Sequence, residues 1–469
     1  MNFEKIEFPN GMPYIIKVQS ITRSPIHWHD GVTEIILPLK GSIKVISNFE
    51  YNYVHEGDFV FVNNKCIHSI QSNDNAIVAI FYINLEHFEQ QFEHIKYMFF
   101  RSNLYTEDSL GITESNLFDN DIRSDYKNRF INLLISLLYS NKNSGDELDG
   151  SMLNKFEYQL IYSMVNEFNW LKFMRITNKY FVSSVQLDRY HRTIKYIDEH
   201  YPEKITLDDI VSREFVTKTY FSHFWKSFTS FSFRDRLNYE RAIRSEFYLL
   251  NGTNISKTSE LCGFSDVKYY YRAFKKWYGC MPKEHKARCE AYEQKKVILQ
   301  TLEIDEIDDI LESYSEQYRV FQCIQDPSLT SFIENYMKLQ ELYKIEKGMK
   351  ANATKSLVID PFKYSDYHLE NNTIVFDWQN MDLCVNLSLD LDFTLNLRLN
   401  CDNIEKGFFY NTISSFIDGC LFRYGSKIVN RWHFFVNYND IAFFNEVNNL
   451  EGPFGGIVNN IKIDYSFTL

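Results

Sequence analysis

The sequence predicts an α+β multidomain chain, and three observations support that fold class. Its 469 residues are about three times the usual length of one domain. Short apolar stretches separated by turn residues fill roughly the first 85 residues, which is typical of strands. Apolar residues then recur at helical spacing, and strand–helix alternation follows from residue 351 onward. We therefore expect an N-terminal antiparallel β-barrel, a helical hairpin, an all-α domain and a C-terminal partial βα-barrel-like segment.

The first 85 residues are expected to form the small barrel. Four short apolar stretches there alternate with turn residues: Thr33 to Leu39, Ser42 to Ile46, Phe59 to Val62 and Ala76 to Ile83. Residues 86–182 change to a helical period, with a Ser/Asn/Gly/Asp-rich loop from Ser140 to Ser151. This pattern predicts a helical hairpin that either packs beneath the barrel or forms a dimer interface, and the sequence leaves both open.

The charge of the chain is unevenly distributed. The whole sequence has a net charge of −12. Between Arg189 and Arg288, however, 19 lysines and arginines stand against 12 acidic residues, so this segment carries +7 and the remainder −19. A basic segment within an acidic chain is expected of a nucleic-acid-binding module, because phosphate binding depends on clustered lysines and arginines.

The cysteines are scattered and suggest no zinc finger. They form neither a C-x-x-C pair nor a cluster with histidines at zinc-finger spacing: Cys66, Cys262, Cys280, Cys289, Cys323, Cys384, Cys401 and Cys420. We expect them to be reduced and mostly buried. The sequence has no apolar run long enough to cross a bilayer and no basic-then-apolar leader, which predicts a cytoplasmic protein without a membrane partner.

Residues 187–289 carry two similar helix pairs. In the first, Thr206 is a plausible N-cap with Asp209 three residues later, and a second helix begins near Thr217. In the second, Ile255 to Leu261 and Asp266 to Trp277 are helical in pattern, and Gly263 between them suits a sharp reversal. The intervening Arg234 to Leu250 segment predicts one long helix. Two helix-turn-helix units joined in this way can present two helices to successive major grooves, about 34 Å apart.

The second unit closely resembles the signature of the AraC/XylS family of transcription regulators. The matching positions are Gly263, Phe264, Phe274, Lys275, Gly279 and Pro282. The resemblance covers about 100 residues and implies a sequence-specific DNA-binding regulator, an activator that contacts RNA polymerase, with a possible homodimer. Carried over by position, the base-reading residues are Thr219, Ser222, His223, Lys268, Tyr269 and Arg272. The expected phosphate contacts are Lys226, Lys275 and Lys276.

The neighbours of these residues are expected to be core residues instead. They are Tyr220, Phe221, Phe224, Tyr270 and Phe274. The chain departs from the family pattern in three places. Ser230 replaces a turn glycine, Ser259 replaces an alanine, and Arg213-Glu214-Phe215 replaces the usual first turn. These departures bear on how the units meet DNA more than on the fold.

The N-terminal segment resembles the cupin motifs. His27, His29 and Glu34 fit the first motif, and His68 follows Gly57-Asp58 as in the second, although Asn63-Asn64-Lys65 stands where a proline–glycine pair is usual. Two histidines, a glutamate and a later histidine can hold a divalent ion. An effector pocket and a purely structural role are the other interpretations of these residues.

The C-terminal segment, residues 351–469, faintly resembles part of a glycoside hydrolase family 39 barrel. The resemblance covers Phe376 to Asp382 and Thr412 to Phe435 and follows an expected helical linker over 290–350. That family places an acid/base glutamate where this chain has Val436 to Asn439, and a full barrel needs about 200 residues or more. We therefore expect an incomplete segment without catalytic residues.

Three functions remain in competition. The leading one is a transcription regulator that is not an enzyme and has no cofactor beyond the possible metal ion. The alternatives are a metal-dependent cupin enzyme fused to a DNA-binding domain, and a DNA-binding remnant that has lost its response to an effector and acts through protein contacts. A ligand-dependent stability shift, about 2.7 kcal/mol at a hundredfold excess over the Kd, separates the first from the last.

Overall fold

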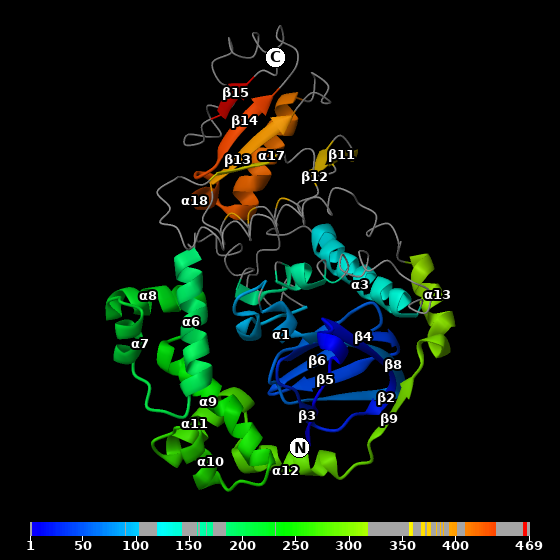
Figure 1. Cartoon of the computed structure of the whole chain (residues 1–469), viewed down its shortest axis with the longest axis vertical. Coiled ribbons are helices and arrows are strands. Elements are labelled where there is room, and N and C mark those ends of the chain that lie inside the picture. The colour runs from blue at the N-terminus through cyan, green and yellow to red at the C-terminus, as the bar shows by residue number, and fades with distance from the viewer. Residues whose placement is uncertain are drawn as a thin grey trace. The chain divides into compact units, whose positions relative to one another are not determined.

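The computed structural model divides the chain into two compact units, each of which is described by itself (Figure 1). The first comprises Met1–Ser109, Arg123–Leu171 and Asp188–Cys323, and the second comprises Leu110–Ile122, Lys172–Leu187 and Ile324–Leu469. The structure describes residues 2–89, 91–102, 120–142, 157, 160–165, 167–171, 184–229, 231–317, 356–359, 367–370, 373–376, 381, 385, 388, 394–400, 409–437 and 463–466. Both units contain strands and helices, so the chain is a mixed α and β protein.

A nine-stranded sheet forms the N-terminal part of the first unit, here called the N-terminal sheet. Its first eight strands are β1 (Asn2–Phe3), β2 (Tyr14–Arg23), β3 (His27–Trp28), β4 (Val32–Lys40), β5 (Ile43–Ser47), β6 (Glu50–Val54), β7 (Val60–Val62) and β8 (His68–Asn84). The long strand β8 pairs antiparallel with β2, β3, β4 and β5. The four stretches predicted as strands lie in or around β4, β5, β7 and β8.

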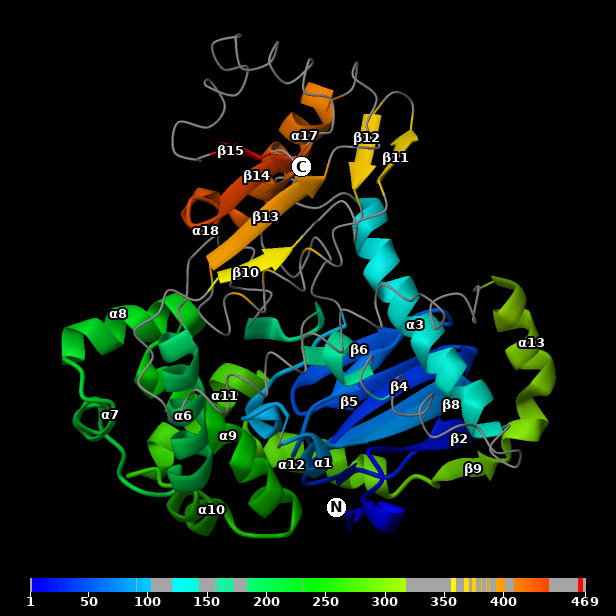
Figure 2. The same ribbon diagram turned by 45° about the horizontal axis from the view of Figure 1, so that its top comes forward.

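The ninth strand of this sheet comes from a distant part of the sequence. Strand β9 (Ile298–Leu302) pairs antiparallel with β2, with Val18 opposite Leu302 and Ile21 opposite Leu299 (Figure 2). The sequence predicts a helical linker over 290–350, and β9 corrects that prediction at its start. The strand covers an edge of β2 whose backbone groups would otherwise lack strand partners. The linker prediction holds for α13 (Asp308–Gln317), which follows the short helix η3 (Ile304–Ile307).

The helical segment after the sheet packs against it. Helix α3 (Asn120–Lys142) places the Phe130 ring 4.9 Å from Phe59 and 4.7 Å from Phe168, with Phe61 5.9 Å away. This aromatic cluster bears out the packing interpretation of the hairpin. Residues 160–165 are helical as predicted, whereas the expected loop from Ser140 to Ser151 lies largely outside the described residues. Shorter helices here are η1 (Pro9–Gly11), α1 (Leu85–Phe88) and η2 (Ile95–Tyr97).

Seven helices follow between residues 184 and 293. They are α6 (Ser184–His200), α7 (Leu207–Arg213), α8 (Lys218–Thr229), α9 (Phe233–Leu250), α10 (Ile255–Leu261), α11 (Val267–Tyr278) and α12 (Pro282–Glu293). Both predicted helix pairs are present, and α9 is the predicted long helix between them (Figure 1). Phe221 and Trp225 are buried in the first pair, and Tyr270 and Phe274 in the second. Each such side chain contributes about 1.5–3 kcal/mol to folding when removed from water.

The second unit contains a four-stranded parallel sheet. Its order is β10 (Ser356–Ile359), β13 (Thr394–Asn400), β14 (His433–Asn437) and β15 (Ile463–Ser466). Helix α17 (Phe409–Tyr424) and the short α18 (Ser426–Val429) connect β13 to β14, as a parallel connection requires. Strands β11 (Tyr367–Glu370) and β12 (Thr373–Phe376) form a separate hairpin. The strand–helix alternation predicted for this segment is therefore present in its described parts.

None of the described helices is both long and apolar enough to cross a membrane.

Candidate DNA-reading surface and buried histidine cluster

The first helix pair is fixed by its caps and its aromatic core. The Thr206 hydroxyl accepts a hydrogen bond from the Asp209 N–H at 3.3 Å, and the Asp209 carboxylate accepts one from the Thr206 N–H at 2.7 Å. This capping box is the one predicted from the sequence. Phe221 and Trp225 hold α8 against the core. The opposite face of α8 is exposed and carries Thr219, Ser222 and His223, together with Lys226.

One of the predicted core residues of α8 is on the surface. Tyr220 is 41% exposed, so the prediction that it is buried is wrong, whereas Phe221 and Phe224 are buried as predicted. The Tyr220 hydroxyl accepts a hydrogen bond from Arg189 at 3.1 Å. Arg189 begins the contact from α6, and its guanidinium lies 5.4 Å from the Tyr220 ring centre. A polar partner on the next helix therefore keeps this tyrosine at the edge of the core.

The second helix pair presents the more basic face. Asp266 caps α11 by accepting a hydrogen bond from the Lys268 N–H at 2.8 Å. Tyr270 and Phe274 are buried, as predicted. Lys268, Tyr269 and Arg272 are exposed on the other face. The remaining two predicted phosphate contacts, Lys275 and Lys276, are exposed as well, and Lys276 makes an ion pair with Asp235 at 2.8 Å.

The two turns share one backbone geometry. At the end of α10, the Phe264 N–H donates to the Ser259 carbonyl at 3.0 Å, and Gly263 has a φ of +75°. At the end of α7, the Val216 N–H donates to the Val211 carbonyl at 3.1 Å, and Phe215 has a φ of +52°. Both turns therefore end their helix with a left-handed residue. Sequence reasoning identified Gly263 but missed Phe215, because a phenylalanine gives no signal for this conformation.

An ionic cluster anchors the central helix α9. Glu240 accepts hydrogen bonds from Arg236 at 2.9 Å and Arg244 at 2.8 Å, both within α9. Arg244 also pairs with Asp198 of α6. Burial alone would raise the pKa of Glu240, but the two arginines outweigh burial and lower that pKa to about 2. The cluster therefore stays charged and joins the helix between the two units to the helix that precedes them.

Four predicted metal-ligating residues meet inside the N-terminal sheet. His27 lies on β3, His29 follows it, Glu34 lies on β4, and His68 lies at the start of β8. All four are buried, and each offers one ligand atom within 4.8 Å of the others. The His68 Nε2 atom lies 3.2 Å from Glu34 Oε2, and the His29 Nε2 atom closely approaches Glu34 Oε1. The pairing of His27 with His68 across β3 and β8 brings the sequence-distant ligand to the others.

The outer nitrogen of each histidine has a backbone partner. The Nδ1 atoms of His27, His29 and His68 lie 3.0 Å from the Pro25 carbonyl, 2.8 Å from the Glu4 carbonyl and 3.1 Å from the Cys66 carbonyl. Because a carbonyl only accepts, each Nδ1 carries the proton and donates. In the neutral form, each Nε2 then keeps its lone pair. This is the second-shell arrangement found around metal-bound histidines.

The inner atoms of the cluster lack aligned hydrogen bonds. Among the described residues, the Nε2 atoms of His29 and His68 and the Oε1 atom of Glu34 are buried with no hydrogen-bond partner of good geometry. Buried polar atoms without partners are costly, and a bound ion is one way to satisfy them. The donor set of three imidazoles and one carboxylate suits a divalent transition-metal ion. The residues therefore fit such an ion.

The protonation states also leave donors for a cation. Burial lowers the pKa of His27 to about 4, with His68 adding to the effect, so His27 is neutral near pH 7. Burial alone would raise the pKa of Glu34, but His68 and His29 outweigh burial and hold that pKa well below its usual range. Burial alone would lower the pKa of His29, but Glu34 outweighs it and raises that pKa. Glu34 is thus a carboxylate and His27 a free base.

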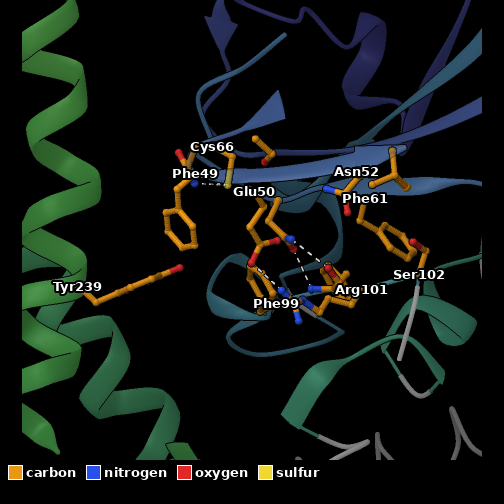
Figure 3. A pocket seen from close by; sticks show the side chains of 14 residues that line it. Phe49, Glu50, Asn52, Phe61, Cys66, Phe99, Arg101, Ser102 and Tyr239 are labelled. Atoms are coloured by element: carbon orange, nitrogen blue, oxygen red, sulfur yellow. Dashed lines mark hydrogen bonds and ion pairs between the residues drawn. The ribbon is translucent and has the colours of Figure 1, made fainter. Parts of the chain in front are cut away.

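A small pocket lies beside the sheet near α9. Figure 3 shows it between the β5–β6 hairpin, the segment around Phe99 and Arg101, and Tyr239 of α9. An ion pair of 2.6 Å between Arg101 and Glu50 crosses it. Its volume of about 40 Å³ admits a few water molecules and no larger molecule. This pocket is therefore too small to be the predicted effector site as it stands.

Comparison with known proteins identifies relatives that are regulators, although no family model matches the chain. A helix-turn-helix-type transcriptional regulator of Bacillus subtilis, YdeC, is 24% identical over 271 residues, which is 56% of this chain and 86% of YdeC. The regulatory protein PocR of Salmonella typhimurium is 24% identical over 96 residues, and the regulator YijO of Escherichia coli is 28% identical over 93 residues. Each of these two matches covers about a fifth of this chain and 32% of the relative.

Solved structures were also found to be similar. The C-terminal domain of the response regulator yesN from Fusobacterium nucleatum is 26% identical, covers 21% of this chain and 98% of that chain, and has a TM-score of 0.20. ToxT from Vibrio cholerae is 13% identical, covers 59% of this chain and 98% of that chain, and has a TM-score of 0.32.

The relatives and the two helix-turn-helix units lead to one functional class. The chain is a DNA-binding transcription regulator. Its relatives, together with the motif that runs from Gly263 to Pro282, indicate a regulator of the AraC type.

Proposed function

We propose that this regulator reads DNA sequence through the exposed faces of α8 and α11, set in two successive major grooves. The observation that carries the proposal is exposure: all nine predicted contact residues lie on the surface, whereas the apolar residues beside them are buried, with Tyr220 as the exception. The base-reading residues are Thr219, Ser222, His223, Lys268, Tyr269 and Arg272. Lys226, Lys275 and Lys276 contact phosphates.

The chemistry of the two helices differs. Arg272 and Lys268 on α11 donate to guanine O6 and N7, which is the commonest specific contact in the major groove. Thr219, Ser222 and His223 on α8 each bond several kinds of base edge and so discriminate less. We therefore assign most of the sequence preference to α11, and register along the duplex to the phosphate-binding lysines.

The test is selection from a random duplex pool with the full chain, followed by affinity measurements at several salt concentrations. Arg272→Ala should weaken binding by about 1–3 kcal/mol and relax the preference at one or two positions. Lys275→Ala, the matched control, should weaken binding to all sequences equally and lower the salt slope by about 1. If Arg272→Ala behaves like Lys275→Ala, Arg272 contacts phosphate and the assignment of the base readers is incorrect.

Activation through contact with RNA polymerase, homodimerisation and a cytoplasmic location complete the proposal, as the resemblance suggests. The proposed domains are a cupin-like sensory barrel over 1–85, a helical region over 86–182, the double helix-turn-helix domain over 187–289, and an incomplete glycoside-hydrolase-like segment over 351–469. The parallel sheet with a helical connection supports that last assignment. Asn437 ends β14, and Tyr438 and Asn439, which follow at the position of the family's glutamate, lie outside the described residues.

We further propose that His27, His29, Glu34 and His68 bind a divalent transition-metal ion. The convergence of buried Nε2 and Oε atoms without aligned hydrogen bonds favours this role over a purely structural one. An organic effector is less well supported by these residues, because four ligand atoms within 4.8 Å of one another leave room for little more than an ion. The relatives are regulators, so sensing is proposed rather than catalysis.

Titration of the metal-free full chain with Co²⁺ tests this site. We expect one ion per chain, an absorption spectrum characteristic of nitrogen and oxygen ligands, and a loss of binding in His68→Ala. His87→Ala is the matched control, because His87 lies on α1 with its Nδ1 3.1 Å from the Gly11 carbonyl and outside the cluster. Unchanged binding in His68→Ala would show that the ion binds elsewhere.

A further inference from the structure

The residue between two of the proposed ligands contacts the DNA-binding part of the chain. His27 and His29 point into the N-terminal sheet, and Trp28 alternates to the opposite side, as adjacent residues of an extended strand do. The Trp28 ring packs edge-on against Phe247 of α9, with ring centres 4.7 Å apart at 87°. Trp28 also lies 4.8 Å from the Phe3 ring. A movement of the backbone that holds both ligands therefore reaches α9 directly.

A second connection starts at the His29 backbone. The His29 carbonyl accepts a hydrogen bond from the Lys65 N–H at 3.1 Å. The Lys65 ammonium then pairs with Asp198 of α6 at 3.0 Å, and Asp198 pairs with Arg244 of α9. Lys65 is thus the link from the sheet to the ionic cluster that anchors α9.

Helix α9 is the element through which such a contact affects DNA reading. It joins the two helix-turn-helix units, and its Phe247 and Arg244 receive both connections. On the far side of the DNA-binding helices, the Tyr292 hydroxyl on α12 donates to the Ser24 carbonyl at 2.7 Å, just before β3. The spacing between two recognition helices must match the helical repeat of DNA, so small changes at the joining helix alter affinity.

We propose that metal occupancy of the histidine cluster controls DNA affinity through the contacts of Trp28 and Lys65 with α6 and α9. This inference rests on the proposed metal site and adds its regulatory role. A bound ion fixes His27 and His29, and with them the backbone that carries Trp28 and the carbonyl that holds Lys65. Fixing these contacts orders α9 before DNA binds, so less ordering remains to be paid for on binding. The metal-loaded chain therefore binds its DNA site more tightly.

The experiment measures two quantities on the full chain: Co²⁺ binding by titration, and the Kd for the selected duplex with and without Co²⁺. In the wild type, Co²⁺ should tighten DNA binding about fivefold or more. In Phe247→Leu and in Lys65→Met, Co²⁺ should still bind with wild-type affinity, but its effect on the DNA Kd should fall to about twofold or less. Neither residue is a proposed metal ligand or a DNA contact.

The matched control is Tyr53→Leu. Tyr53 is an aromatic residue of β6 that is 69% exposed, and this variant should keep the full fivefold response. If the wild type binds Co²⁺ but its DNA Kd does not change, or rises, the coupling is refuted while the metal site stands. If Co²⁺ does not bind the wild type, the proposed metal site itself fails and the inference falls with it. A full response in both Phe247→Leu and Lys65→Met would refute the proposed route.

Discussion

The two helix-turn-helix units share a backbone turn but differ in how that turn is stabilised. In the second unit, Gly263 adopts a φ of +75° and lies against the backbone of Tyr201 and Pro202. In the first unit, Phe215 adopts a φ of +52° and its side chain is 94% exposed. A phenylalanine in the left-handed region costs roughly 1–2 kcal/mol, which glycine avoids. The second turn is thus tightly packed, whereas the first is strained and open.

The ionic support of the two units differs in the same sense. The first unit is held by Glu214, which pairs with Arg192 at 2.7 Å and with Arg189 at 3.4 Å, and the Arg192 side chain is about half exposed. The second is held by Glu246 of α9, which is buried and accepts hydrogen bonds from His285 at 2.6 Å and Tyr278 at 2.7 Å. Exposed pairs contribute little, whereas breaking a buried pair is costly. The comparison predicts that the second unit is the more rigid reader.

The largest effect is expected at the packed turn. In Gly263→Ala, the new Cβ would lie 2.7 Å from the Pro202 carbonyl carbon and 2.8 Å from the Tyr201 carbonyl oxygen. This clash adds to the cost of the positive φ, so the free energy of unfolding should fall by about 3 kcal/mol or more. Urea denaturation measures it. Gly252→Ala is the control, because Gly252 has a φ of +87° and no atom within 4 Å of the new Cβ, and it should cost about 1–2 kcal/mol. Equal losses in the two variants would show that the turn is not tightly packed.

The buried pair of the second unit should make stability depend on pH. Burial alone would lower the pKa of His285, but Cys289 and Glu246 outweigh burial and raise it to about 10. The stabilisation is fully present below the ordinary histidine pKa of about 6.5 and is lost as the pH rises through about 10. At pH 6, His285→Gln should lower the free energy of unfolding by about 3 kcal/mol, and this difference should shrink toward pH 10. A difference that stays constant over this range would contradict a charged His285.

The difference between the reading helices should appear in DNA affinity. Arg272→Ala should cost about 1–3 kcal/mol on the selected site, because a charged donor to guanine is lost. Ser222→Ala should cost about 0.5–1.5 kcal/mol, because one neutral hydrogen bond is lost. Fluorescence anisotropy with a labelled duplex measures both. Lys257→Ala on α10, which removes an exposed pair with Glu260, is the control and should leave the affinity nearly unchanged. A larger loss in Ser222→Ala than in Arg272→Ala would reverse the assignment of the specific helix.

The smallest effect is expected at the open turn. Phe215→Gly removes the strain of the left-handed conformation but increases the entropy of the unfolded chain. Because the side chain is exposed, little burial is lost. The net result should be a gain of up to about 1 kcal/mol in the free energy of unfolding, measured by urea denaturation. Phe215→Val keeps a side chain in the strained position and should destabilise instead. If Phe215→Gly destabilises the protein, the exposed ring has a stabilising contact or the turn is not strained.

Local patterns in the sequence were sufficient for the helix pairs. The predicted ranges Ile255 to Leu261 and Arg234 to Leu250 agree with α10 and α9 to within one residue. The capping box at Thr206 and the left-handed Gly263 were predicted as well. Caps, glycine turns and the helical period depend on neighbours within a few residues, which is why they can be read without a tertiary structure.

Contacts between distant segments were not predictable in this way. Strand β9 lies in a segment predicted as helical linker, because its pairing with β2 depends on an edge almost 280 residues earlier in the chain. Tyr220 was predicted to be buried by its spacing, but Arg189 of another helix holds it at the surface. The connections from Trp28 to Phe247 and from Lys65 to Asp198 likewise join segments that have no common sequence signal.

The sequence alone determined the basic double helix-turn-helix, the exposed faces of its reading helices and the four candidate ligands, since each depends on residue type and short spacing. Only the tertiary structure brought His68 to the other three ligands, through the pairing of β3 with β8. It also decided that the N-terminal sheet contacts α6 and α9. Such contacts arise when the chain buries apolar surface and pairs backbone groups over long loops, and many pairings satisfy the same local pattern until the whole fold selects one.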